Sequence, residues 1–275
     1  MVVKLSLHAA GSCFQLEKLV LQGGRLKNIR FPAMFALIKH PSEGYILFDT
    51  GYSSHVLAET KRFPTSLYAK IIPIVFEEQD SAANQLKALG ISPESIKKII
   101  LSHFHTDHIG GLRDFPNAEF IFTASAGNTI QELSGFKALT AAFIPELLPE
   151  NFWQRTRQLD DSKLAPDPLN YPGFERGYDL LGDGSLVAVN LPGHAIGQIG
   201  VFVLTQERSV LLAADACWVS RAFRELIYPN PLARMFIADN KAFNASLQKL
   251  HRLHCLRPDI LIIPTHCEEA LCSLS

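Results

Sequence analysis

His103-Phe104-His105-Thr106-Asp107-His108 is the stretch that decides how the rest of this chain is interpreted. It places three imidazoles and one carboxylate within six residues. Imidazoles this close together in water would titrate near neutrality and add little stability, whereas imidazole nitrogens and carboxylate oxygens together suit zinc and its neighbours. The motif follows the apolar run 99–101 and precedes Gly110-Gly111. It therefore predicts a metal site on a loop at the carboxyl end of a strand.

Three later residues could complete such a site. His194, Asp215 and His266 each come directly or closely after an apolar run that predicts a strand. A single histidine in such a place is more often a hydrogen-bonded structural residue. Three residues of this kind, all at strand ends, are more consistent with ligands that join the first motif.

The composition excludes several classes of protein. Of the 275 residues, 47% are hydrophobic and 19% charged, which excludes a disordered chain. The 26 Lys+Arg against 27 Asp+Glu give a net charge of −1, which argues against a nucleic-acid partner held by bulk charge. The sequence contains no run of eighteen apolar residues, so it predicts no membrane-spanning helix. The first residues lack a basic stretch and contain His8, so we expect a first strand rather than a signal peptide, and a cytoplasmic location.

The apolar patterns predict an α/β chain in one domain, residues 1–275. Strands and helices alternate loosely, with several strands directly following one another, which favours a sandwich with sheets inside and helices outside. One helix is expected to be capped by Asp80 and to stop at Gly90, and another to open at Asp239. The predicted strands are 2–8, 34–39, 45–48, 99–101, 120–122, 186–191, 199–204, 210–214 and 260–263.

Residues 134–178 do not fit this alternation. The stretch is rich in proline and contains an apolar segment, 141–148, followed by Trp153. An insertion of this length predicts a lid or binding loop over the metal residues, or an ordered excursion with no role of its own.

The order of these motifs resembles the metallo-β-lactamase superfamily. An aspartate after an early strand, the H-x-H-x-D-H run, and then His, Asp and His at successive strand ends match Asp49, residues 103–108, His194, Asp215 and His266. The resemblance implies a four-layer αβ/βα sandwich with two divalent metal ions between the sheets, zinc first and manganese or iron as alternatives. It implies that Asp49 binds no metal ion itself but supports the residues that do. The implied ligands are His103, His105 and His194 for the first ion, Asp107, His108 and His266 for the second, and Asp215 as the bridge.

Two divalent ions held in this way can make water reactive near neutral pH. The resemblance implies attack by a metal-bridging hydroxide, with Asp107 as the catalytic residue that passes a proton to the leaving group. The expected reaction is hydrolysis of a small-molecule ester or lactone. A thioester or phosphoester hydrolase of the same fold, a mononuclear iron sulfur dioxygenase and a non-catalytic metal-binding relative are the alternatives.

The layout is most similar to the N-acyl homoserine lactone lactonases. The shared features are the opening 9–13 after a strand, the S-H-x-H-x-D-H-x-G-G run and the P-G-H that ends at His194. That family commonly has a tyrosine three residues after the bridging aspartate, where this chain has Trp218. Either the substrate is held differently, with Tyr228 as a second candidate contact, or another ester-like substrate is used; Trp218 could also be only a wall of the pocket or core.

The apolar segments 141–153 and 228–236 point to the kind of partner. They would suit a small substrate that bears an acyl chain, and would equally suit a homodimer contact.

Overall fold

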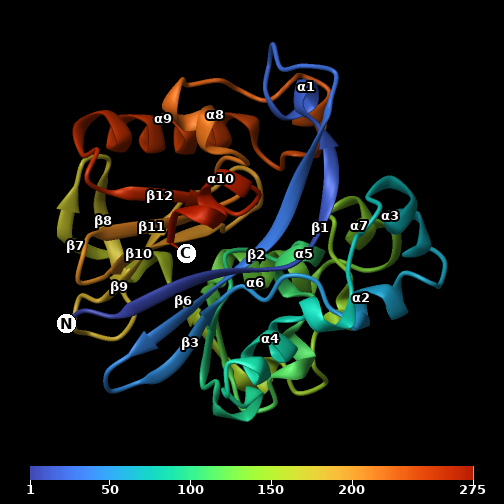
Figure 1. The fold of residues 1–275 in the computed structure, drawn as a ribbon, viewed down its shortest axis with the longest axis horizontal. Helices are drawn as coiled ribbons and strands as arrows, with labels where there is room; N and C mark the ends of the chain where they lie inside the picture. Colours follow the sequence, from blue (N-terminus) through green and yellow to red (C-terminus); the bar gives the residue numbers. More distant parts are fainter. Residues whose placement is uncertain (275) are drawn as a thin grey trace.

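Two six-stranded mixed sheets pack face to face in residues 1–274, the part of the chain that the computed structural model describes; of residues 161 and 165–169 it describes only the backbone. Ser275, the last residue of the expected domain, lies outside the described residues. The first sheet has the order β1-β2-β3-β4-β5-β6 and the second the order β12-β11-β10-β9-β8-β7 (Figure 1). Strands β1 to β6 span Lys4–Leu16, Asn28–His40, Gly44–Phe48, Lys98–Ile100, Glu119–Thr123 and Thr156–Leu159. Strands β7 to β12 span Ala165–Tyr171, Phe174–Asp179, Leu186–Asn190, Ile199–Leu204, Ser209–Ala214 and Leu261–Pro264.

Several strands, β2, β10 and β11 among them, are apolar on both faces because each sheet is covered on both sides. In β2, Phe35 and Leu37 face one hydrophobic cluster while Met34 and Ile38 face another. The alternation repeats in β11, where Leu212 points between the sheets and its neighbour Leu211 points outward. Such double burial explains the continuous apolar runs in the sequence. The result is the predicted αβ/βα sandwich.

Helices cover the two outer faces (Figure 1). Buried residues of α2, α4, α5, α6 and α7 pack on the first sheet, and those of α8 and α9 pack on the second. Within residues 1–274, none of the helices combines the length and apolar character needed to cross a bilayer. Helices α1 to α5 span Glu17–Val20, Ser54–Glu59, Ser66–Ile71, Ala82–Ala88 and Thr106–Ile109; helices α6 to α10 span Ala124–Gln131, Gly135–Thr140, Ser220–Arg224, Asn240–Leu256 and Glu268–Leu271.

One of the two predicted helix caps is wrong. Ser81, not Asp80, caps α4, because its side chain accepts a hydrogen bond from the Asn84 N–H. Asp80 instead ends a preceding 3₁₀ turn and accepts from the Glu77 N–H. Asp239 caps α9 as predicted, accepting from two backbone N–H groups of its first turn.

Much of the segment 134–178 belongs to the two sheets. Strand β6 forms an edge of the first sheet, and β7 forms an edge of the second with β8 next to it. The apolar residues after α7 are core rather than surface, because Phe143, Ile144, Leu147 and Phe152 are all buried in the first cluster. An insertion that acts as a separate lid would therefore have to lie outside these strands and this core.

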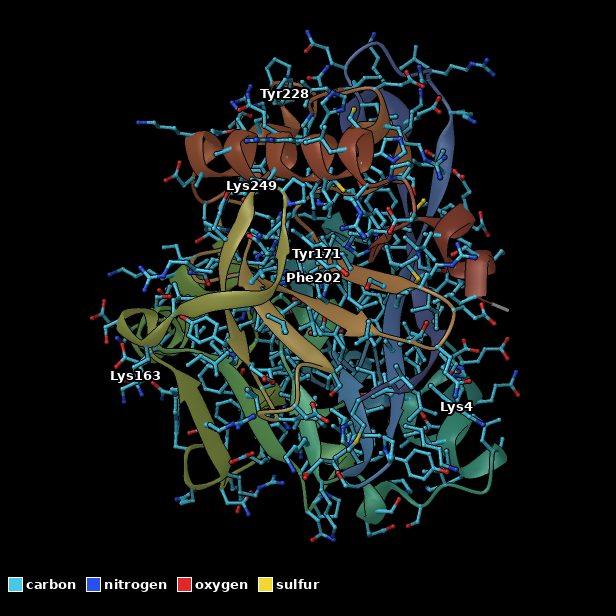
Figure 2. The ribbon with its side chains drawn as sticks, turned by 90° about the vertical axis from the view of Figure 1, so that its left-hand side faces the viewer. Lys4, Lys163, Tyr171, Phe202, Tyr228 and Lys249 are labelled. Atoms are coloured by element: carbon cyan, nitrogen blue, oxygen red, sulfur yellow. The ribbon has the colours of Figure 1, made fainter. Side chains whose placement is uncertain are left out.

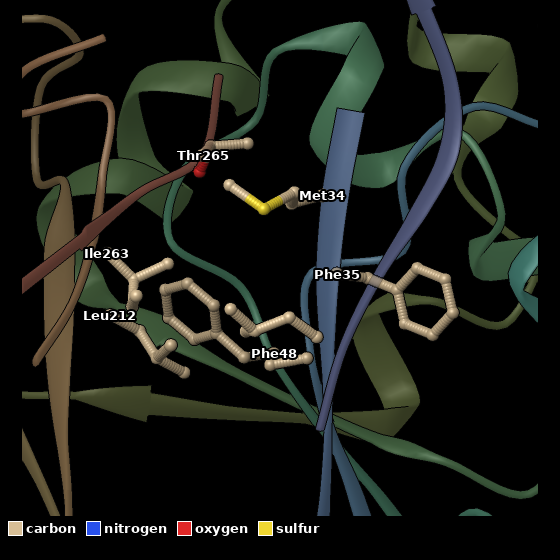
Figure 3. Close-up of a pocket in the computed structure, with 8 residues that line it drawn as sticks. Met34, Phe35, Phe48, Leu212, Ile263 and Thr265 are labelled. Carbon is tan, nitrogen blue, oxygen red and sulfur yellow. The ribbon is translucent and has the colours of Figure 1, made fainter. Parts of the chain in front are cut away.

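The layer between the sheets is closely filled. A cavity of about 10 Å³ remains there, and Figure 3 shows Met34, Phe48, Leu212 and Ile263 gathered around it while Phe35 points away. Thr265, the residue before His266, lies at the same cavity. The strand ends that carry the motif residues therefore lie next to closely packed side chains between the two sheets.

Candidate metal centre

The seven side chains singled out in the sequence meet at one place, at the carboxyl ends of the strands. The loop after β4 and the short helix α5 carry the H-x-H-x-D-H residues, while the segments after β9, β11 and β12 carry His194, Asp215 and His266. Among the residues that the structure describes, three groups have potential ligand atoms within 4.8 Å of one another: His103, His105 and His194; His103, His108 and Asp215; and Asp107, His108 and His266. The first and third groups are the two ligand sets that the resemblance implies.

Asp215 lies between these two groups. Its Oδ2 is 3.2 Å from His194 Nε2 and 3.0 Å from His266 Nε2, and its Oδ1 is 3.3 Å from His108 Nε2. One carboxylate thus contacts a member of each group, which is the geometry that a bridging ligand needs.

Asp49 and Ser102 fix the orientation of two imidazoles. The Asp49 carboxylate accepts from the Ser102 N–H at 2.8 Å, from the Ser102 hydroxyl at 2.7 Å and from His108 Nδ1 at 2.7 Å. Because the Ser102 hydroxyl donates to Asp49, its oxygen accepts from His103 Nδ1 at 3.0 Å. This network assigns the protons of His103 and His108 to Nδ1 and leaves Nε2 of both rings able to bind a cation.

His266 is fixed by two neighbouring residues of β2. Its Nδ1 donates to the Pro32 carbonyl at 2.9 Å, and its ring stacks on Phe31 at 4.8 Å between centroids. Its Nε2 then points to Asp215 and, at 3.5 Å, to Asp107 Oδ2. His266 therefore also carries a proton on Nδ1 and directs Nε2 toward the other ligands.

The buried polar atoms of this cluster fit divalent cations. Within residues 1–274, His103 Nε2, His108 Nε2, His194 Nδ1 and Asp215 Oδ1 are buried without a hydrogen-bond partner. Buried polar groups of this kind are costly unless something pairs with them. Imidazole and carboxylate are the donor set expected for zinc and related ions, so the residues present fit such a group.

Burial and mutual charge shift the pKa values of these groups in two directions. Burial lowers the pKa of His103 and His194 well below the usual value and that of His105 to about 4, which keeps these rings neutral. Burial also opposes the charged form of His108, but the carboxylates around it outweigh burial and raise its pKa; Asp215 does the same for His266. In the absence of cations, His108 and His266 therefore each carry a second ring proton, and a bound cation would replace that proton.

The backbone at the centre is strained or closely packed. Asp49 has φ 58° and Ala214, just before Asp215, has φ 48°, a left-handed conformation that costs of order 1–3 kcal/mol for a non-glycine residue and occurs often at functional sites. Gly193, just before His194, has φ 130°, and a Cβ there would lie 2.1 Å from the Phe243 backbone nitrogen. Only glycine lets the His194 loop approach α9 so closely.

The structure brings one of the two candidate substrate residues to the centre. The Trp218 ring lies perpendicular to the His194 ring, 5.8 Å between centroids. Tyr228 lies at α9, where Gln248 donates to its hydroxyl at 3.1 Å and Gln22 N–H to its carbonyl (Figure 2). Those contacts do not reach the seven side chains.

Four supporting residues were not found from the sequence. Ser102 precedes the motif directly and could have been recognised as a hydroxyl beside two histidines. Phe31 and Pro32 lie far from His266 in the chain, and no local sequence pattern predicts their contacts with His266. Ala142, whose carbonyl accepts hydrogen bonds from Thr106, is equally remote.

A four-layer αβ/βα sandwich with this His/Asp cluster defines a class of metal-dependent hydrolases. The model of the metallo-β-lactamase superfamily matches residues 30–266, and the chain belongs to that superfamily. It is a metal-dependent hydrolase, as its curated relatives are. The "Probable metallo-hydrolase Rv2300c" of Mycobacterium tuberculosis is 30% identical over 248 residues, which cover 84% of this chain and 73% of the relative. The N-acyl homoserine lactonase AttM of Agrobacterium fabrum is 27% identical over 257 residues, covering 93% of this chain and 89% of the relative.

Solved structures share the fold. AiiA of Bacillus thuringiensis, in a variant with N-decanoyl-L-homoserine bound at its active site, has a TM-score of 0.74 at 22% identity and covers 98% of this chain and 95% of its own. AidC, described as a dizinc quorum-quenching lactonase, has a TM-score of 0.64 at 18% identity and covers 97% of this chain and 88% of its own.

Proposed function

We propose that this chain hydrolyses the ring ester of lactones that carry an acyl chain, N-acyl homoserine lactones among them, with two divalent cations, zinc first. The observation that carries the proposal is the position of Asp215 between the two ligand groups, beside buried atoms that lack a partner. The names of the relatives AttM and AiiA, and the dizinc lactonase AidC, support the substrate class and the pair of zinc ions.

When bound, the two cations lower the pKa of coordinated water toward neutrality and polarise the carbonyl oxygen of the substrate. His103, His105 and His194 would hold the first cation, and Asp107, His108 and His266 the second. Asp215 would contact both. Asp49 keeps the proton of His108 on Nδ1, so that Nε2 stays available.

Asp107 would move the proton. Its side chain is 15% exposed, against 3% for Asp215, and its oxygens lie 3.5 Å and 4.0 Å from the nearest imidazole nitrogens, farther than those of Asp215. A carboxylate held this loosely can take a proton from the attacking water on one oxygen and deliver it to the leaving alkoxide. Ring opening then releases the hydroxy acid.

Trp218 and an apolar rim would hold the substrate. The indole N–H of Trp218, whose ring lies beside His194, would donate to a substrate carbonyl. The segment before α9 hydrogen-bonds to the His194 loop, since Ala238 N–H donates to the His194 carbonyl at 3.2 Å, and the nearby Met235 and Phe236 are largely exposed. Ile196, two residues after His194, is half exposed. This rim suits an acyl chain.

The test is hydrolysis of a lactone panel with acyl chains of increasing length, measured by the acid that ring opening releases. Exhaustive chelation should abolish hydrolysis, and zinc or manganese should restore it. Turnover that survives chelation contradicts the proposal. Hydrolysis confined to thioesters or phosphoesters refutes the lactone substrate, and oxygen consumption with thiol substrates by a chain holding one iron identifies the dioxygenase alternative instead.

A further inference from the structure

Phe104 and Thr106, the two residues that lie between the ligands of the H-x-H-x-D-H motif, both contact one segment that is remote in the chain. Phe104 packs edge-on to Phe143 at 6.2 Å between ring centroids. Thr106, fully buried, donates from its N–H at 2.9 Å and from its hydroxyl at 2.8 Å to one acceptor, the carbonyl of Ala142. Ala142 and Phe143 thus contact the two motif residues that lie between the ligands, Thr106 and Phe104 respectively.

The carbonyl of Ala142 takes the place of a helix cap. Thr106 is the first residue of α5, and the side chain of His105 before it makes no capping hydrogen bond. The first N–H groups of a helix have no partner within the helix, so the Ala142 carbonyl supplies one that the local sequence lacks. The helix that begins there carries Asp107 and His108.

The end of α7 holds Ala142 in an unfavourable conformation. Phe143 N–H donates to the Ala138 carbonyl and Ala142 N–H to the Leu139 carbonyl, both at 3.0 Å, which is the Schellman pattern of a helix C-terminus. The residue at this position is usually glycine, yet Ala142 has φ 50°. A strained residue persists where the surroundings over-determine it, and here Phe143 and Ile144 are anchored in the core.

We infer that Thr106 is a positioning residue, which sets the placement of Asp107 and His108 through the Ala142 carbonyl at the end of α7. The inference rests on the proposed function, because those two residues belong to the second ligand group. Residues 135–143 then support the metal loop rather than open and close over it. Thr106 itself binds neither cation nor substrate.

The test compares Thr106→Val, Thr106→Ser and Thr60→Val with the wild-type chain. Thr60 is a matched control, since its buried hydroxyl donates to the Val56 carbonyl at 2.7 Å in α2. Chelator competition gives the dissociation constant of the weaker-held Zn²⁺, and the absorption spectrum of the Co²⁺-loaded chain reports the ligand geometry. We expect Thr106→Val to weaken Zn²⁺ binding about 10–100-fold and to change the Co²⁺ spectrum, and Thr106→Ser to restore both.

Several results would overturn the inference. A Thr106→Val chain that holds Zn²⁺ as tightly as Thr60→Val, with an unchanged Co²⁺ spectrum, shows that Thr106 serves stability alone. If Thr106→Val does not fold, as judged by circular dichroism, Thr106→Ala removes the same hydroxyl from a smaller side chain and decides in its place. A wild-type chain that binds no cation overturns the proposed function together with this inference, whereas two tightly bound cations in every variant overturn only the inference.

Discussion

Replacing Asp49 with asparagine should loosen the metal centre while barely changing the shape of the side chain. Asp49 is fully buried and accepts three hydrogen bonds, from the Ser102 N–H, the Ser102 hydroxyl and His108 Nδ1. Asparagine offers one acceptor oxygen and one NH₂ group. The oxygen must stay with the Ser102 N–H, for which residues 1–274 offer no other hydrogen-bond acceptor, so the NH₂ faces the hydroxyl and the His108 ring.

The new NH₂ group then reverses the tautomer of His108. Its Nδ1 can no longer donate and must accept, so the proton moves to Nε2, the atom 3.3 Å from Asp215 Oδ1 that should bind the cation. Displacing that proton, or leaving a buried donor without a partner, costs ~1–3 kcal/mol. Loss of such a supporting hydrogen bond typically weakens metal binding by about 10–100-fold. We therefore expect the Asp49→Asn chain to lose affinity for the second cation by that factor.

The assay is chelator competition with Zn²⁺ on the folded variant. Asp183→Asn is the matched control, because Asp183 accepts from His40 Nε2 at 2.9 Å in a similar aspartate–histidine pair outside the metal cluster. Equal Zn²⁺ affinities for Asp49→Asn and Asp183→Asn would refute the tautomer argument.

Three further predictions concern stability, turnover and pH. Gly193→Ala should lower the free energy of unfolding in urea by ~2–6 kcal/mol, since its Cβ would lie 2.1 Å from the Phe243 backbone nitrogen; Gly90→Ala, with φ 74° but no atom within 4 Å of its Cβ, should lose less, and equal losses would contradict the steric account. Asp107→Asn should retain at least the first cation by elemental analysis yet lower kcat by ~10²–10⁴-fold; an unchanged kcat would remove its role as proton carrier. Burial would raise the pKa of Asp183, but the hydrogen bonds that its carboxylate accepts lower it to about 2. Its unfolded value is near 3.9, so its stabilising contribution is complete above about pH 4 and is lost as the pH falls toward 2. The stability gap between wild type and Asp183→Asn, measured by urea unfolding, should shrink over that range, and a constant gap would contradict the assignment.

The sequence predicted the fold well wherever local patterns report burial. The runs 199–204 and 210–214 are apolar throughout because β10 and β11 are covered on both faces, and both were predicted as strands. The segment 134–178 was harder to interpret. Its strands β6 and β7 are edge strands, with β8 next to β7, and β7 contains Pro166 and Pro168, so this part of the sequence resembles a loop.

The seven ligand residues of the candidate site could be predicted from the sequence, but, Asp49 apart, the residues that hold them in position could not. Motif order was enough to single out the seven side chains that the structure brings within reach of one another. The contacts of Phe31 with His266 and of Ala142 with Thr106 join residues that are distant in the chain. Sequence spacing carries no signal for such contacts, because only the packing of the two sheets and α7 creates them.

The most direct test is a crystal structure of the purified chain, with the element at each cation identified by anomalous scattering. We predict two divalent cations per chain, both in contact with Asp215, one beside the histidines of the first ligand group and one beside Asp107, His108 and His266. A chain that holds no cation at these side chains, after purification without chelator and with zinc supplied, would contradict the account.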